Sequence, residues 1–110
     1  MQIVDLHDDA AFQSLGVEVL SLAPDSLPLL RQEVQRWGIR TPLLHDAGNR
    51  VATLYDVMQW AAPTGEPGHT FVLVDEQGAV RWIQDYGAPQ NGGLMYVEPD
   101  VLYREVSSRL

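Results

Sequence analysis

Three histidines are the side chains best suited to acid–base or metal chemistry, because each has a carboxylate nearby in the sequence. The pairs are His7 with Asp8 and Asp9, His45 with Asp46, and His69 with Asp75. A metal site is conceivable where the fold brings His7, His45 and Asp46 together. No H-x-H or H-E-x-x-H spacing supports such a site. We therefore expect no bound metal, and we expect Asp46 or Asn49 to cap a helix.

Nucleophilic chemistry has little support in this sequence. The chain has no cysteine, which removes thiolate nucleophiles, disulfides and thiolate zinc sites. Ser14, Ser21 and Ser26 could each be paired with a histidine base, but no G-x-S-x-G elbow is present. We predict no catalytic residue and no cofactor for this chain.

Two aromatic residues are candidates for binding a partner. Trp60 stands beside a loop rich in Pro and Gly (62–68), and Tyr96 ends a Gly-containing segment (91–96). We expect both to be exposed, and exposed aromatic side chains often anchor partners. Packing beneath a loop is the commoner alternative. Trp37 and Trp82 are expected in the core instead.

The composition excludes several classes of partner. The chain has 110 residues, 45% of them hydrophobic and 20% charged, which suits one globular domain over residues 1–110. Its formal net charge is −8, and its arginines stand singly without any lysine, so we expect no nucleic acid and no anionic membrane as a partner. No apolar run approaches the ~18 residues of a membrane span. No secretory signal is visible, so we expect a cytoplasmic protein.

Hydrophobic periodicity and turn residues predict alternating helices and strands. Helices are expected at 5–15, 27–37, 50–58 and from Pro99 onward, and strands at 17–22, 39–44, 69–74 and 79–86. The turn at 75–78 joins the last two strands into an antiparallel hairpin. In the helix at 27–37, Leu27, Leu30, Val34 and Trp37 form the face that we expect to be buried. The order predicts an α/β fold, a mixed sheet with helices on both faces.

Five segments resemble the peroxiredoxin (alkyl hydroperoxide reductase/thiol-specific antioxidant) branch of the thioredoxin-like proteins. They follow in the family's order and spacing: GVEVLSLAPDS (16–26), WGI (37–39), TPLLHD (41–46), VATLYDV (51–57) and TFVLVDEQGAVR (70–81). The resemblance covers roughly residues 16–86 and implies a thioredoxin-like fold. In such proteins a helix N-terminus lowers the pKa of a reactive cysteine that reduces peroxides or disulfides.

The chain departs from this pattern in two places. The family's first strand and its cysteine-bearing loop have no counterpart, and residues 2–15 resemble the helix that follows them. Gly68 stands where peroxiredoxins tend to place an arginine and thiol–disulfide oxidoreductases a cis-proline. By the resemblance, Gly68, His69 and Thr70 would face the missing cysteine and line the groove where a thiol substrate docks. The structural alternative, which we favour for His69, is a strand-edge histidine bonded to the loop at Glu66.

The resemblance also implies an N-terminally incomplete sheet. The missing strand would lie between the strands at 17–22 and 69–74, leaving two open edges. These strands could pair directly, a second copy could fill the gap as a homodimer, or the chain could be a fragment. We therefore expect a part of a peroxiredoxin-like thiol–disulfide oxidoreductase, inactive without cysteine, with a thiol or disulfide protein as the intact protein's partner. The alternative is a complete, redox-inactive protein used for binding or self-association.

Overall fold

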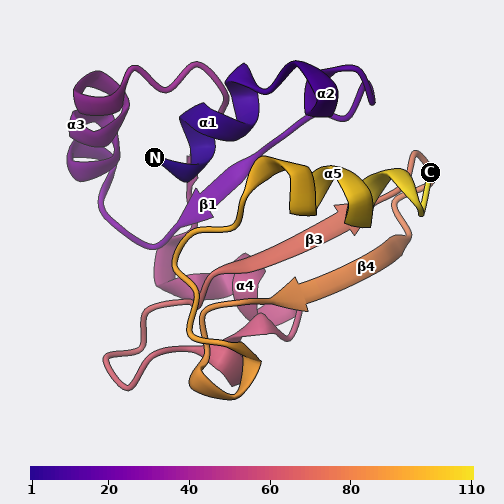
Figure 1. Cartoon of the computed structure of the whole chain (residues 1–110). Coiled ribbons are helices and arrows are strands. Elements are labelled where there is room, and N and C mark those ends of the chain that lie inside the picture. The colour runs from indigo at the N-terminus through magenta and orange to yellow at the C-terminus, as the bar shows by residue number, and fades with distance from the viewer.

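The computed structural model describes all residues from Met1 to Leu110. Its main elements are α1 (Gln2–Asp8), α2 (Ala10–Gln13), β1 (Ser21–Ala23), α3 (Leu27–Trp37), β2 (Leu43–His45), α4 (Arg50–Leu54), β3 (Thr70–Val74), β4 (Val80–Asp85) and α5 (Pro99–Ser107). Three 3-10 turns join them: η1 (Ala47–Asn49), η2 (Val57–Trp60) and η3 (Pro89–Asn91). Figure 1 shows α5 on one side of β3 and α4 on the other. The predicted mixed α/β class is confirmed.

The strands form two small sheets instead of one. β1 pairs in parallel with β2, and β3 pairs antiparallel with β4. β1 and β3 do not pair with each other, so the hypothesis that these two strands close up directly is wrong. The strand predicted at 17–22 is accordingly reduced to three paired residues, because a ladder exists only where a neighbour supplies the opposite hydrogen-bonding groups.

The first predicted helix is broken at Asp9. Its backbone is extended there, and its carboxylate accepts a hydrogen bond from the backbone N–H of Phe12 at 2.8 Å. An aspartate in this position is a strong N-cap, so the chain restarts as α2 instead of continuing α1. The break lets Leu6 and Phe12 both reach the core.

Helix α3 begins and ends where the sequence predicts, but its buried face is narrower. Gly38 ends it with a left-handed backbone, φ 65°, which glycine adopts without strain. Only Leu30 is buried. Leu27 is 49% exposed, and Trp37 is 42% exposed with its indole N–H bonded to Glu33, so the expectation that these two lie in the core is wrong. The reason is that α3 packs on the short β2 strand at the edge of the molecule.

The core lies between α1, α2, α5 and the hairpin. Its buried members are Leu6, Phe12, Leu73, Val97, Leu102 and Val106, with Trp82 packed against them. Trp82 therefore contacts the core as predicted. Each fully buried side chain of this size contributes about 1.5–3 kcal/mol by leaving water.

Candidate functional site

A hydrophobic groove separates the two sheets. It has a volume of about 540 Å³ and runs between residues 17–23, which include β1, and residues 67–74, which include β3; we call it the β1–β3 groove. Gly68, His69 and Thr70 all line it. The position of the groove is where the sequence analysis places the missing strand.

Helices cover the groove on two sides. One side is formed by core side chains of α1, α2 and α5, and the other by side chains of α4 and its neighbours. The lining residues are Leu6, Phe12, Leu102 and Val106 on the first side and Val51, Ala52, Tyr55 and Val57 on the second. An extended segment lying in the groove would thus contact apolar side chains on both of its faces, as the central strand of an α/β sheet does.

The edge of β3 that faces the groove has free backbone groups. The backbone N–H of Tyr86 donates to the carbonyl oxygen of His69 at 2.8 Å, and hydrogen-bonded pairs alternate along an antiparallel ladder. The backbone groups of Phe71 and Leu73 therefore face β4. Those of Thr70 and Val72 face the groove.

The groove edge of β1 is open in the same way. The backbone N–H of Ser21 donates to Pro42 at 3.0 Å, and the carbonyl oxygen of Ala23 accepts from the N–H of Asp46 at 2.8 Å. Ser21 and Ala23 thus use their backbone groups on β2, which leaves those of Leu22 pointing into the groove. The arrows of β1 and β3 in Figure 1 run in opposite directions. A strand inserted between them would be parallel to one neighbour and antiparallel to the other.

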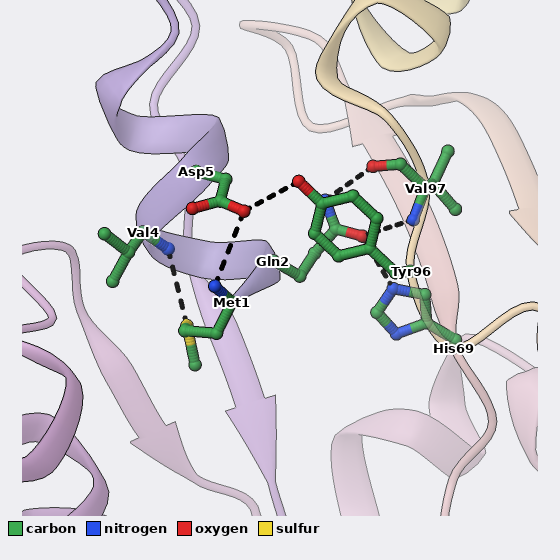
Figure 2. Close-up of polar contacts among 7 residues, drawn as sticks. All are labelled: Met1, Gln2, Val4, Asp5, His69, Tyr96 and Val97. Atoms are coloured by element: carbon green, nitrogen blue, oxygen red, sulfur yellow. Dashed lines mark hydrogen bonds and ion pairs between the residues drawn. The ribbon is translucent and has the colours of Figure 1, made fainter.

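His69 is held by the first turn of α1, not by Glu66 as the favoured alternative expected. Its ring Nε2 lies 3.1 Å from the side-chain oxygen of Gln2 (Figure 2). The same Gln2 amide donates to the carbonyl oxygen of Val97 and accepts from its backbone N–H. Burial lowers the pKa of His69, and the negative charge of Asp85 opposes this only in part. The ring is therefore neutral at pH 7.

Asp85 is the buried carboxylate of this region. It is only 1% exposed. It accepts hydrogen bonds from the hydroxyl of Thr70 at 2.8 Å, the backbone N–H of Ala88 at 2.8 Å and the side chain of Asn91 at 3.0 Å. Burial raises its pKa, but these bonds outweigh burial and lower the pKa below the ordinary value. The one signal in the sequence is an acidic residue at the end of an apolar hairpin.

Gly68 is required by close packing against Asp85. A Cβ atom at this position would lie 2.7 Å from the Oδ1 atom of Asp85 and 2.9 Å from the carbonyl oxygen of Trp60. No side chain fits there without displacement. This explains why the position cannot hold the arginine or proline that the resemblance would place there.

One end of the groove opens into a smaller hollow with acidic side chains. This acidic hollow has a volume of about 200 Å³ and is formed by residues 22–25 and 66–68. Leu22, Ala23, Pro67 and Gly68 belong to both spaces, so the two are continuous. The carboxylates of Asp25 and Glu66 are exposed, and neither takes part in an ion pair.

The two aromatic candidates lie on separate elements. Tyr96 is 38% exposed, and its hydroxyl donates to the carboxylate of Asp5 at 2.7 Å, which raises the pKa of Tyr96 to about 12 (Figure 2). Trp60 ends η2 and is half-buried. Tyr96 is thus exposed as expected, whereas Trp60 is only partly exposed.

Two of the residues considered for a metal, His45 and Asp46, make other contacts. The ring Nδ1 of His45 lies 2.6 Å from the carbonyl oxygen of Asp25. Asp46 accepts from the backbone N–H groups of Val51 and Ala52, so it caps α4 as predicted. No three His, Asp or Glu side chains are grouped as metal ligands would be. No helix has the length and apolar character needed to cross a membrane.

Comparison with known proteins supports the predicted resemblance. Residues 1–83 match the model of the AhpC/TSA family. This range contains both strands that border the β1–β3 groove, β1 and β3, while α5 lies beyond it. No curated protein sequence matches the chain. The architecture is consistent with a partial thioredoxin-like fold.

Proposed function

Because the chain belongs to the AhpC/TSA family and has no cysteine, we propose that it is the scaffold part of a peroxiredoxin-like thiol oxidoreductase, inactive by itself. The typical peroxidatic thiol chemistry is absent from these 110 residues. In the proposed function, an extended segment docks in the β1–β3 groove and completes the mixed sheet. Any reactive thiol comes with that segment or with a thiol protein partner.

The observation that supports this proposal is the groove itself. Two neighbouring edges point unpaired backbone groups at each other, from Leu22 on one side and from Thr70 and Val72 on the other. Apolar side chains line the space between them. Addition of a strand to open edges is a recurrent mode of peptide binding, in which main-chain hydrogen bonds supply affinity and side-chain pockets supply specificity.

The first test is enzymatic. The chain is assayed for peroxide reduction with a thiol reductant and for reduction of insulin disulfides. We expect the rates of buffer alone, because no thiolate is available to attack a peroxide or a disulfide. Turnover above the buffer rate would show that side chains other than a thiol perform the reaction.

The second test addresses the groove. The probe is a labelled peptide of about six residues with valine and isoleucine at its centre and serine at both ends, which matches the usual length of a strand. We expect it to bind, and we expect Val72→Pro to abolish binding. Proline removes the N–H that faces the groove and leaves the bonds between β3 and β4 in place.

Ile83→Pro is the matched control. Ile83 is the ladder partner of Val72, and its backbone groups point away from β3, toward the outer edge of the hairpin. The control should bind the peptide as the unmodified chain does, and circular dichroism should show both variants folded. Equal binding by both proline variants, or no binding by the unmodified chain, would contradict the proposed docking.

Self-association is the second candidate function. The outer edges of β2 and β4 are also unpaired, and open edges are templates for another chain. Light scattering after size exclusion distinguishes the two candidates. A monomer at high protein concentration supports peptide docking alone, and a dimer that Ile83→Pro dissolves would place the contact at the outer edge of β4.

A further inference from the structure

We propose that Asn91 is a modification site, at which the side-chain amide is converted to a carboxylate by attack of the backbone nitrogen of Gly92. The product no longer fits beside Asp85, so the modification releases the segment between β4 and α5 (residues 86–98), which we call the β4–α5 segment. The reaction consumes water and needs no enzyme. It is independent of peptide docking in the β1–β3 groove.

The chemistry follows from an asparagine that precedes a glycine. Asn91 is the only such residue in the chain, since Asn49 precedes an arginine. When hydroxide removes the proton from the backbone N–H of Gly92, the nitrogen attacks the Cγ atom of Asn91. A C–N bond forms and the amide leaves as ammonia. Water then opens the cyclic imide at either carbonyl, which gives aspartate or isoaspartate. Glycine has no Cβ atom to hinder this ring closure.

The attacking nitrogen lies in an exposed and weakly bonded turn. Gly92 is exposed, and its N–H donates to the carbonyl oxygen of Pro89 at 3.3 Å. The neighbouring N–H groups of Asn91 and Gly93 donate to the carbonyl oxygen of Ala88 at 2.8 and 3.1 Å. The bond of Gly92 is thus the longest of the three, and hydrogen bonds weaken with distance. Local opening of η3 at its last residue therefore frees the nitrogen and admits water.

The side chain of Asn91 is the second restraint. Its Nδ2 atom donates to the Oδ2 atom of Asp85 at 3.0 Å, and the Cγ atom reaches the Gly92 nitrogen once this bond opens. A hydrogen bond to a charged group holds the closed state about 10–100-fold over the open one. We therefore expect the native chain to react about 10–100-fold more slowly than a free peptide of residues 88–94.

The product cannot return to the closed state. Asp85 is 1% exposed, and its Oδ2 atom also accepts from the backbone N–H of Ala88 at 2.8 Å. A carboxylate at position 91 would place a second negative charge at the 3.0 Å contact that the amide now makes. Because two carboxylates in a buried site do not both stay ionised, one must take up a proton or move away. The modification thus removes an anchor of the β4–α5 segment irreversibly.

The first experiment follows the native chain by mass spectrometry at about pH 8 and about pH 6, with the peptide of residues 88–94 as reference. Digestion uses pepsin in acid, which leaves asparagine amides intact. We expect a gain of about 1 Da at Asn91, because OH replaces NH2, and we expect isoaspartate among the products. The rate should be higher at the higher pH, since hydroxide activates the nitrogen. Asn49 should stay unchanged, as an internal control.

A variant of the restraint tests the role of Asp85. Asp85→Asn replaces the charged acceptor by a neutral one and should raise the rate at Asn91 about fivefold. Asp100→Asn is the matched control, because its carboxylate is 75% exposed and pairs with Arg104 instead. It should leave the rate unchanged. Circular dichroism shows that both variants are folded during the incubation.

The consequence is tested with variants at position 91. Asn91→Asp carries the charge of the product, and Asn91→Ser loses the same amide without gaining a charge. We expect Asn91→Asp to melt about 4–8 °C below Asn91→Ser, with faster hydrogen exchange at the backbone N–H of Ala88. Asp85→Asn combined with Asn91→Asp restores a single carboxylate to the pair. Together these two substitutions should therefore cost less stability than the sum of their separate effects.

Three results would overturn this inference. A native rate more than about a thousandfold below that of the peptide shows that the fold blocks the attack, since it exceeds what the two restraints supply. An unchanged rate in Asp85→Asn removes Asp85 as the restraint. Equal melting temperatures for Asn91→Asp and Asn91→Ser remove the charge repulsion that makes the release irreversible. None of these results bears on peptide docking, so the proposed function stands or fails separately.

Discussion

Replacement of Asp85 by asparagine tests whether one buried carboxylate holds the segment after β4 in place. The side chain is 1% exposed and accepts hydrogen bonds from Thr70, Ala88 and Asn91. Asparagine has nearly the same shape, but it is neutral, and its NH2 group donates a hydrogen bond where the carboxylate oxygen accepts one. With this NH2 group turned to the hydroxyl oxygen of Thr70, which can also accept, asparagine keeps the contacts but loses the stronger hydrogen bonds of the charged carboxylate.

The magnitude can be worked from these contacts. A hydrogen bond to a charged group contributes about 1.5–3 kcal/mol and one between neutral groups about 0.5–1.5 kcal/mol, a difference of about 1 kcal/mol for each of the three bonds. We expect Asp85→Asn to lower the free energy of unfolding by about 3 kcal/mol, out of the roughly 5–15 kcal/mol typical of a domain. For a chain of this size, the melting temperature should fall by about 10–20 °C.

The assay is thermal and urea unfolding followed by circular dichroism. Asp100→Asn is the control, because its carboxylate is 75% exposed and pairs with Arg104 at 3.9 Å in solvent. Such a pair contributes about 0–1 kcal/mol. If Asp85→Asn melts within two or three degrees of Asp100→Asn, about the shift expected for a surface change, the carboxylate is not structural.

The pH dependence supplies a second check. The pKa of Asp85 is lower in the folded state than in the unfolded state, so its stabilisation is present above the unfolded pKa, near 4. This stabilisation is lost as the pH falls through the folded pKa. The difference in unfolding free energy between the unmodified chain and Asp85→Asn should therefore shrink below about pH 4. A constant difference down to the lowest pH would refute the assignment.

Three further substitutions in the same region have predicted effects. His69→Gln should remove the loss of stability that occurs as the pH falls below about 6.5, since the lowered pKa of His69 makes protonation favour the unfolded state; urea unfolding at a series of pH values measures it. Gly68→Ala should destabilise the fold by about 1–3 kcal/mol in thermal unfolding, because its Cβ atom would stand 2.7 Å from an oxygen of Asp85. Asp5→Asn should shift the ionisation of Tyr96, followed by phenolate absorbance, from about 12 toward the ordinary value near 10.

Local features of the fold were predictable because their causes are local. Gly38 ends α3 and Gly78 completes the hairpin turn, both with positive φ angles that glycine adopts freely. Asp46 caps α4 through two backbone N–H groups a few residues away. The hairpin of β3 and β4 follows from two apolar runs joined by a tight turn.

The candidate site was predictable only in outline. The family resemblance located the gap beside Gly68, His69 and Thr70, and all three line the groove. The partner of His69 was not predictable, because Gln2 lies 67 positions away in the chain and meets it only through packing. The burial of Asp85 was not predictable, since alternation along a strand does not show which residues a later loop will cover.

By itself the sequence determined which chemistry this chain lacks, because that depends on residue types alone. It also determined the order of the helices and strands, because short-range spacing acts through neighbouring backbone groups. It established the absence of a thiol and the positions of the turns and most helices. Only the tertiary structure decided that β1 and β3 stay apart, which backbone groups face the β1–β3 groove, and that the acidic hollow opens at one end of it. These properties depend on segments far apart in the chain, whose spacing is set by the packing of α1, α2 and α5 on the hairpin.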